Sequence, residues 1–445
     1  MAEIKCPREW VEWTDWLAAG LHGRCRWRLP ILLAGILFAR PKQTVASWLR
    51  AAGVGLGFSN YYYFIAALAR KSKMLGGILL NLLLNRLASG ERVLFALDDT
   101  PTKRYGPEVE GAGIHHNPTP GPADAAYLYG HIWVTLALIA HHPLWGTIGL
   151  PVLAALYIRQ IDVPDLPRHL KWKFQTKLQL AVNLVCWLNG HVKAAGKRLW
   201  IVADGFYAKR PVLKKLRGWG VTVVSRLRKD AALRDLPSVL KKGQRRSRGR
   251  PRKYGKNRIS LAKRAGQKGG WQIVECLQYG KKALKKYKTF LATYVPADGV
   301  IRVVIVQEET GCHFFFCTDP FATVQEILEA FADRAAIEQV FHDLKEVWGA
   351  GKQQLRNLWA NIGAYHLNMW IYSLVELWAW NKPKTEICDR SASPWDDPDR
   401  RPSHADRRKA LCRNILQLEL STLSVTGPIQ RKIENLFARS LNASV

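Results

Sequence analysis

The sequence predicts an α/β fold in which helices flank a mixed β-sheet, and three observations support this prediction. Between residues 91 and 230, short apolar runs typical of buried strands alternate with amphipathic helical patterns. Residues 1–90 contain helical patterns alone. Residues 231–320 begin with a basic stretch and continue with strand-like runs, which predicts a basic, β-rich insertion. Helical patterns return over 321–380, and a basic helical tail is expected over 381–445.

Two short helices are predicted within the N-terminal region. Thr44–Ala51 forms the first and Ser59–Arg70 the second, and Ala52-Gly53 separates them. A helix, a short turn and a second helix form the DNA-binding helix-turn-helix motif. A plain helical bundle has the same spacing, so the pattern favours neither alternative. Residues 1–90 are therefore a candidate DNA-binding domain.

The remaining elements are expected where apolar runs lie between turn signals. In the first part of the core, strands are predicted at Val93–Leu97, Tyr127–Ile139, Gly146–Tyr157, Leu199–Ala203 and Val221–Arg226, and helices at Phe174–Leu188 and Arg210–Gly218. In the insertion, strands are predicted at Trp271–Gln278, Tyr287–Tyr294, Val300–Val306 and His313–Cys317. Two long helices follow at Val324–Val347 and Leu355–Trp380, and residues 381–410 are expected to form a flexible surface segment.

The charge of the chain indicates a polyanionic partner. Lys and Arg number 67 against 35 Asp and Glu, which gives a net charge of +32. Like charges repel in the compact state, so this excess favours binding to nucleic acid first and to an anionic membrane surface second. The longest apolar stretch, Ile132–Ile158, is broken by Gly and Pro, and no amphipathic anchor is found. A membrane role is therefore not expected.

The cysteines indicate a reducing compartment. There are eight of them, and they are scattered with no pair at the spacing of a zinc site. No signal peptide opens the chain. Reduced thiols in a cytoplasmic protein fit this pattern best.

Three acids stand out by their positions. Asp98, or its neighbour Asp99, and Asp204 follow apolar runs that are expected to be buried strands. In open α/β sheets the carboxyl ends of the strands form the ligand-binding edge. The third acid, Glu338, lies on a helix after the insertion, on one face with Phe331, Arg334, Phe341 and Lys345.

Two interpretations of the helix around Glu338 are possible. Arg334 and Glu338 are four residues apart, so they could form an ordinary surface ion pair. Alternatively, three carboxylates could hold two hard cations for phosphodiester cleavage, with waters and substrate completing the shell. Cations beside a carboxylate also suit a scissile phosphate, because they neutralise its charge.

The helix carries the most specific resemblance to a known family. Phe331, Arg334, Glu338 and Lys345 have the spacing of a Tyr-Arg-Glu-Lys signature, with Phe where Tyr is usual. In this the chain resembles DDE-superfamily transposases of bacterial insertion sequences.

Two shorter segments are similar to the aspartate strands of the same family. Asp98-Asp99-Thr100 resembles the first, in which Asp is commonly followed by any residue and then Thr, and this favours Asp98 with Asp99 as the alternative. Asp204-Gly205 resembles the second.

The resemblance implies a fold, a reaction and partners. It implies a ribonuclease-H-like core, with Asp98, Asp204 and Glu338 as catalytic metal ligands for Mg²⁺ or Mn²⁺, two ions in all, and no organic cofactor. Arg334 and Lys345 would contact DNA. The reaction would be cleavage at transposon ends followed by strand transfer into target DNA, by a homodimer on double-stranded DNA. A non-catalytic DNA-binding protein is the alternative.

A basic segment within the insertion offers further DNA contacts. Residues 245–256 read RRSRGRPRKYGK, and their core, Arg248-Gly249-Arg250-Pro251, matches an AT-hook that enters an A·T minor groove. Contact with phosphates by a solvated loop is the other interpretation, and it is the one favoured. Arg248, Arg250 and Lys253 are the candidate DNA-binding residues of this segment.

Overall fold

A computed structural model describes residues 5–117, 125–237, 252–388, 390, 395–397, 399–421, 433 and 436. Its described strands form one sheet of twelve strands. In spatial order these are β2 (Gly113–His116), β3 (Tyr127–His142), β1 (Arg92–Lys103), β5 (Arg198–Ala203), β6 (Thr222–Arg226), β12 (Gly311–Cys317), β11 (Gly299–Glu308), β10 (Lys281–Tyr294), β7 (Leu233–Arg234) and β8 (Arg258–Ile259). Off this path, β4 (Gly146–Tyr157) pairs with β3 and β9 (Gln272–Gln278) pairs with β10.

The sheet is mixed, as predicted. Strands β1, β5 and β6 run parallel to one another, whereas β3 and β12 join them antiparallel. Parallel neighbours need crossovers, and α6 (Lys177–Ala194) and α7 (Arg210–Gly218) supply them. The α/β fold class is confirmed, and a mixed sheet with helices on its faces is the arrangement of a ribonuclease-H-like core.

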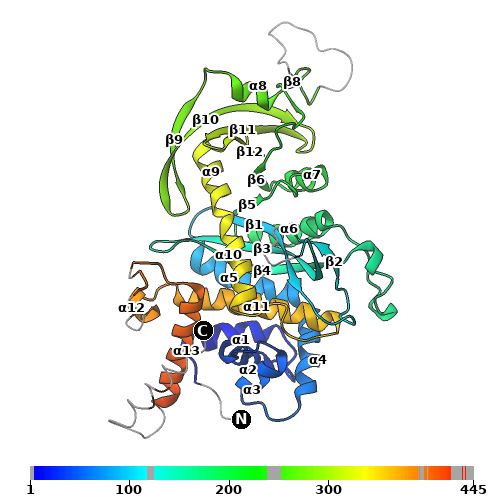
Figure 1. Ribbon diagram of the computed structural model, residues 1–445, viewed down its shortest axis with the longest axis vertical. Coiled ribbons are helices and arrows are strands. Elements are labelled where there is room, and N and C mark those ends of the chain that lie inside the picture. The colour runs from blue at the N-terminus through cyan, green and yellow to red at the C-terminus, as the bar shows by residue number, and fades with distance from the viewer. Residues whose placement is uncertain are drawn as a thin grey trace.

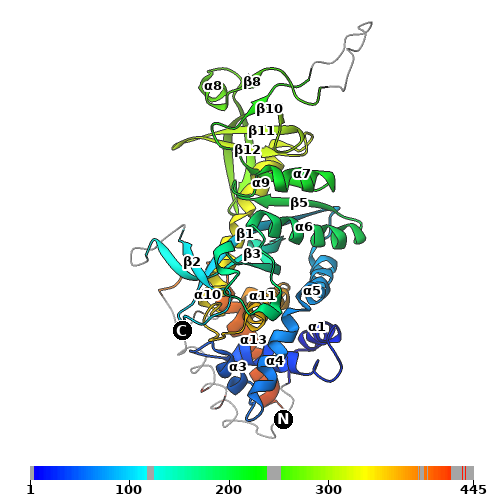
Figure 2. The ribbon, with the colours of Figure 1, turned by 90° about the vertical axis from the view of Figure 1, so that its right-hand side faces the viewer.

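Helices cover both faces of this sheet (Figure 2). On one face, alternate residues of β1 and β5 pack with α6 and α7 in the larger hydrophobic core. On the other face, the intervening residues pack with α9 (Val324–Asp333) and α10 (Ala335–Glu346) in a second core. Because successive side chains of a strand point to opposite faces, Val93, Phe95 and Leu97 of β1 belong to the first core, and Leu94 and Ala96 lie in the second.

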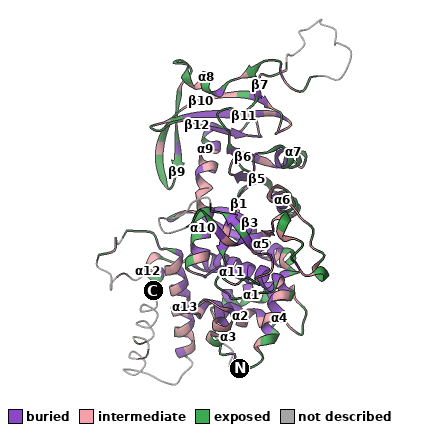
Figure 3. Cartoon of the chain, turned by 45° about the vertical axis from the view of Figure 1, so that its right-hand side comes forward, coloured by how far each residue is buried: buried purple, intermediate pink, exposed green. Residues whose placement is uncertain are grey.

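The N-terminal helices form a bundle around one central helix (Figure 1). These helices are α1 (Arg8–Ala19), α2 (Arg28–Phe38), α3 (Val45–Ala51), α4 (Phe58–Ala69) and α5 (Ser72–Leu87). The central helix, α11 (Leu358–Ala379), is buried over almost its whole length (Figure 3). A helix that is apolar all round belongs in a core. The side chain of Thr44 caps α3, and α4 packs against α11 while Tyr63 stays exposed. The helix-turn-helix alternative remains a prediction.

Three predicted boundaries are wrong. Strand β1 continues to Lys103, so Asp98 and Asp99 lie within it, because pairing with β3 supplies hydrogen bonds beyond Leu97. Helix α6 begins at Lys177, where a capping box formed by Thr176 and Gln179 starts it. The long helix predicted over Val324–Val347 is interrupted at Arg334, which separates α9 from α10.

The strands of the predicted insertion extend the main sheet. Strand β12 pairs with β6, and β11 and β10 follow it outward. A short helix, α8 (Leu261–Gly266), lies beside them at the top of Figure 1.

The C-terminal part includes a buried helix. After α12 (Lys384–Ile387), helix α13 (His404–Leu420) begins inside the segment predicted to lie on the surface. The Arg408 guanidinium, 2% exposed, donates to the backbone carbonyls of Ile36, Leu37 and Ala39 at the end of α2. Arg407 pairs with Glu376 of α11 at 2.8 Å. The surface prediction is therefore wrong for the start of α13, because these two cations have buried partners.

Two further observations concern the whole described chain. No helix in the described ranges is long and apolar enough to cross a membrane. All eight cysteines are free thiols.

Candidate active site

The first two acids lie next to each other on neighbouring parallel strands. Leu97 of β1 pairs with Ala203 of β5. Asp98 and Asp204 each follow directly, so they occupy the next row across the sheet. Asp204 is the first residue after β5 and is partly buried. The predicted position at the carboxyl end of a strand is found for Asp204 but not for Asp98.

Asp98 and Asp99 lie on opposite faces of β1. Asp98 has the orientation of Ala96, which packs in the core beneath α9 and α10. Asp99 points to the α6 face, where Lys177 donates to its Oδ2 at 2.6 Å and the Tyr207 hydroxyl donates to its Oδ1 at 2.6 Å. Both oxygens of Asp99 thus have partners on the side away from Glu338.

Arg334 connects the first acid to the third. Its Nη1 donates to Asp98 Oδ2 at 2.7 Å, and its Nη2 donates to Glu338 Oε1 at 2.6 Å. The Arg334 and Asp98 side chains are 16% and 19% exposed, while the Glu338 side chain is 58% exposed. The predicted ion pair between Arg334 and Glu338 is present, and a second carboxylate shares it.

The surroundings of Asp98 penalise its charged form. Burial is the main cause that raises the pKa of Asp98, to about 6, and the neighbouring charges of Asp99 and Asp204 add to it. The Arg334 charge and the hydrogen bond from the Asp99 backbone N–H act in the opposite direction. A carboxylate held at such a cost would be stabilised by a cation placed between it and Asp204.

Phe331 lies between two arginines. The Arg226 guanidinium carbon is 5.1 Å from the centre of its ring and that of Arg334 is 5.6 Å away, while the ring packs at 4.9 Å against Phe315. A phenyl face stacks on guanidinium groups without a hydroxyl. The ring therefore holds two cations beside the acids.

Arg226 is a candidate that sequence reasoning missed. It ends β6, two residues beyond the pair formed by Val202 and Val224, which places it in line with Asp204. Arg226 is exposed. The sequence contains a signal for this candidate, because Arg226 is the last residue of the strand predicted after the Asp204 strand.

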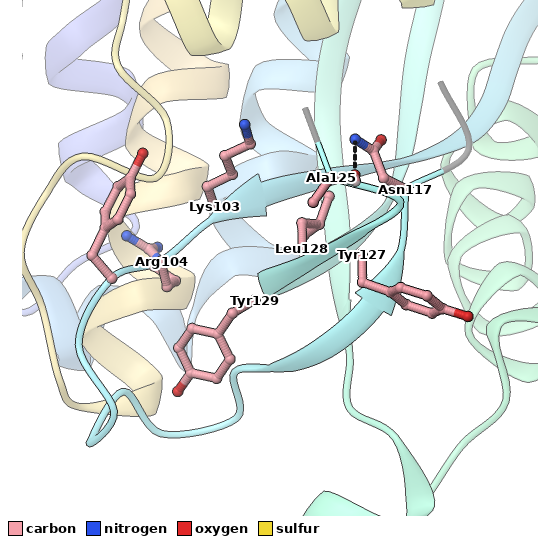
Figure 4. Close-up of a pocket in the computed structure, with 8 residues that line it drawn as sticks. Lys103, Arg104, Asn117, Ala125, Tyr127, Leu128 and Tyr129 are labelled. Atoms are coloured by element: carbon pink, nitrogen blue, oxygen red, sulfur yellow. Dashed lines mark hydrogen bonds between the residues drawn. The ribbon is translucent and has the colours of Figure 1, made fainter. Parts of the chain in front are cut away.

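Lys345 lies in the last turn of α10, close to Lys103 of β1. Burial lowers the pKa of Lys345, and the positive charge of Lys103 lowers it further. Lys103 also lines a pocket of about 270 Å³ with Arg104, Asn117 and three tyrosines, and its described lining contains no acid (Figure 4). The predicted cation at position 345 thus belongs to a basic surface that continues along β1 from the acids.

The remaining predicted DNA contacts are only partly placed. Arg248 and Arg250 lie outside the described residues. Lys253 is described, and its Nζ forms an ion pair with Asp298 Oδ2 at 2.7 Å.

His131, which follows the first aspartate in sequence, receives a hydrogen bond from Arg104 Nε at 3.1 Å and contacts the Glu110 carbonyl at 3.0 Å.

The three candidate acids are ligands of the type that hard divalent cations prefer, but they are not grouped as in a formed metal site. Carboxylate oxygens are the ligands that Mg²⁺ and Mn²⁺ prefer, and Asp98 and Asp204 present them in one row. Across the described ranges, no three Asp, Glu, His or Cys side chains are grouped closely enough to hold a metal ion. A shared site therefore requires the exposed Glu338 side chain to move toward the aspartates.

Asp98 and Asp204 thus lie in one row of the sheet, and Arg334 connects Asp98 to Glu338 on the overlying helix. A family model described as DDE superfamily endonuclease matches residues 17–286, which is more than half of the chain. The chain belongs to this DDE superfamily endonuclease family. The matched region includes Asp98 and Asp204 and ends before Glu338. No curated protein matches the chain.

Proposed function

We propose that the chain is a DNA transposase that cleaves phosphodiester bonds at transposon ends and transfers the strands into target DNA. The observation that carries this proposal is the pair of bonds from Arg334 to Asp98 and Glu338, with Asp204 in the same row of the sheet as Asp98. Family membership supports a nuclease, and the arrangement of these residues supports a metal-dependent one.

Asp98, Asp204 and Glu338 are the proposed ligands of two Mg²⁺ or Mn²⁺ ions. When bound, such ions activate a water nucleophile and stabilise the leaving oxygen of an in-line displacement. Burial of Asp98 beneath α10 keeps bulk water from its carboxylate. The Glu338 side chain is 58% exposed, so it has room to change rotamer once its ion pair with Arg334 opens. Asp99 is proposed to orient β1 through Lys177 and Tyr207 and not to bind metal.

The cations around the acids are proposed to hold the DNA backbone. Arg334 and Arg226 flank Phe331, so their guanidinium groups lie where a phosphate would enter the acidic row. Planar guanidinium groups bind phosphate with two parallel hydrogen bonds. Lys345 would contact the next part of the backbone. Arg248 and Arg250 are proposed to add contacts from the insertion, and a homodimer would bring two DNA ends together.

The alternative function is a DNA-binding protein without catalysis. One observation favours it, because the described residues contain no ready-made group of three metal ligands. The two functions differ in whether DNA is cut, and not in whether it is bound.

A nicking assay separates the two functions. The substrate is a supercoiled plasmid that carries the coding region with its natural flanking DNA, so that any element ends are present. We expect nicks at the boundaries of that insert in Mg²⁺ or Mn²⁺ and none in EDTA. Binding to the plasmid without nicks in either metal would contradict the proposal and establish the alternative.

A further inference from the structure

The break between α9 and α10 contacts a hairpin of the same sheet, formed by β3 and β4. Asp333 ends α9, and its carboxylate contacts two side chains at the tip of the β3–β4 hairpin. His141 Nε2 lies 2.8 Å from Oδ2, and the Thr147 hydroxyl donates to Oδ1 at 2.6 Å. His141 and Thr147 face each other in the strand register. We name these three side chains the hairpin clamp; it holds both oxygens of an Asp333 side chain that is only 11% exposed.

The residue after the clamp is Arg334. Its backbone is helical, with φ −53° and ψ −32°, yet no side chain caps the start of α10 there. The Arg334 Nε is buried and has no hydrogen-bond partner within the described structure. The guanidinium is therefore placed by its backbone, by its bonds to Asp98 and Glu338, and by its contact with the Phe331 ring.

The same hairpin also seats the first turn of α10. A Cβ atom at Gly149 would lie 3.1 Å from the Ala336 carbonyl oxygen and 3.0 Å from a Val340 methyl group. A side chain at this position would push against the helix, so glycine favours the close approach of β4. The hairpin thus contacts the chain on both sides of Arg334.

From these contacts we infer that Asp333 is a positioning residue for the cleavage site. The hairpin clamp fixes the break between α9 and α10, and the break directs Arg334 between Asp98 and Glu338. The effect of Asp333 on cleavage rests on the proposed function. The contacts of the hairpin clamp do not depend on that function. Asp333 is not one of the proposed metal ligands or DNA contacts.

The clamp has a pH dependence with a defined sign. The hydrogen bond to Asp333 is the main cause that raises the pKa of His141. Glu329 of α9 also raises it, whereas burial and Arg92 of β1 lower it. Protonated His141 forms an ion pair with Asp333, and this pair becomes a neutral hydrogen bond as pH rises through the pKa of His141. The clamp is therefore stronger below the pKa of His141 than above it, over the pH range in which Asp333 is charged.

The test compares clamp variants in single-turnover nicking of the same plasmid with protein in excess. Asp333→Ala should lower the rate about tenfold, because a small displacement of an orienting group costs about that much or more. DNA affinity should stay unchanged. Asp333→Asn keeps an oxygen for Thr147 and should recover most of the rate. Asp165→Ala, which removes an exposed acid far from the hairpin, is the matched control. The ratio of wild-type to His141→Gln rates should fall as pH rises.

The possible outcomes distinguish this inference from the proposed function. Wild-type nicking with an equal rate in Asp333→Ala overturns the inference and leaves the function standing. If the wild-type chain never nicks the plasmid, the proposed function is overturned. The clamp is then tested by the free energies of unfolding of its variants, measured with denaturant. In that measurement, Asp333→Ala and Arg334→Ala should be non-additive, because neighbours in one network couple. Additive losses would overturn the clamp.

Discussion

Replacement of Glu338 by alanine is expected to lower Mg²⁺-dependent nicking on the order of a thousandfold, as loss of an essential group in a catalytic site does. The affinity for DNA should remain close to that of the wild type. The physical reason is that the third carboxylate would be lost while Arg334 keeps its bond to Asp98. The measurement is single-turnover cleavage together with a binding titration in Ca²⁺.

Glu346→Ala is the matched control for that variant. It removes an exposed acid from the last turn of the same helix. We expect its cleavage rate to equal that of the wild type. Cleavage by Glu338→Ala at the wild-type rate would remove Glu338 from the catalytic site.

Asp98→Asn is expected to stabilise the metal-free protein at pH 8 by about 3 kcal/mol, as an upper bound, since each unit of pKa difference corresponds to about 1.4 kcal/mol. The pKa of Asp98 is about 6 in the folded chain, against 3.8 for an aspartate in water. Because the folded pKa is the higher one, the stability contributed by Asp98 is complete below about pH 4 and is lost as pH rises through about 6. Asparagine carries no charge, so the variant should not lose that stability. Urea unfolding in EDTA at pH 4 and pH 8 measures it.

Added Mg²⁺ should reverse the order of the two proteins. A cation that binds the folded wild type stabilises it by mass action, and Asp98→Asn should gain much less. Asp99→Asn is the control, because it removes the carboxylate that Lys177 and Tyr207 hold on the opposite face. If the wild type is as stable as Asp98→Asn at pH 8 in EDTA, burial of the charged Asp98 carboxylate does not lower the free energy of unfolding.

The sequence was sufficient to predict the fold class and the candidate acids, but not their connections. Glu338 could be selected because helical spacing places it four residues from Arg334. The second bond of Arg334, to Asp98, joins residues 236 positions apart and depends on tertiary structure. The alternation of β1 separates Asp98 from Asp99, and which face carries α10 depends on how the sheet is packed.

Other features were hidden because local signals and tertiary contacts disagree. Asp98, Asp99 and Pro101 resemble the end of a strand, yet β1 continues past them because β3 pairs with it. The break at Arg334 contains no glycine or proline, and its visible anchor, Asp333, contacts a distant hairpin. The sequence around Arg408 predicts a surface charge, whereas in the fold its guanidinium donates to three carbonyls at the end of α2.

The most direct test of the central claim maps where a divalent ion binds. Fe²⁺ substituted for Mg²⁺, with ascorbate and peroxide, produces hydroxyl radicals that cut the polypeptide beside the bound ion. If Asp98, Asp204 and Glu338 share the ions, the cuts will fall near all three positions and will disappear when excess Mg²⁺ competes. Cuts at other positions, or cuts near the aspartates that never include the Glu338 region, would contradict the claim.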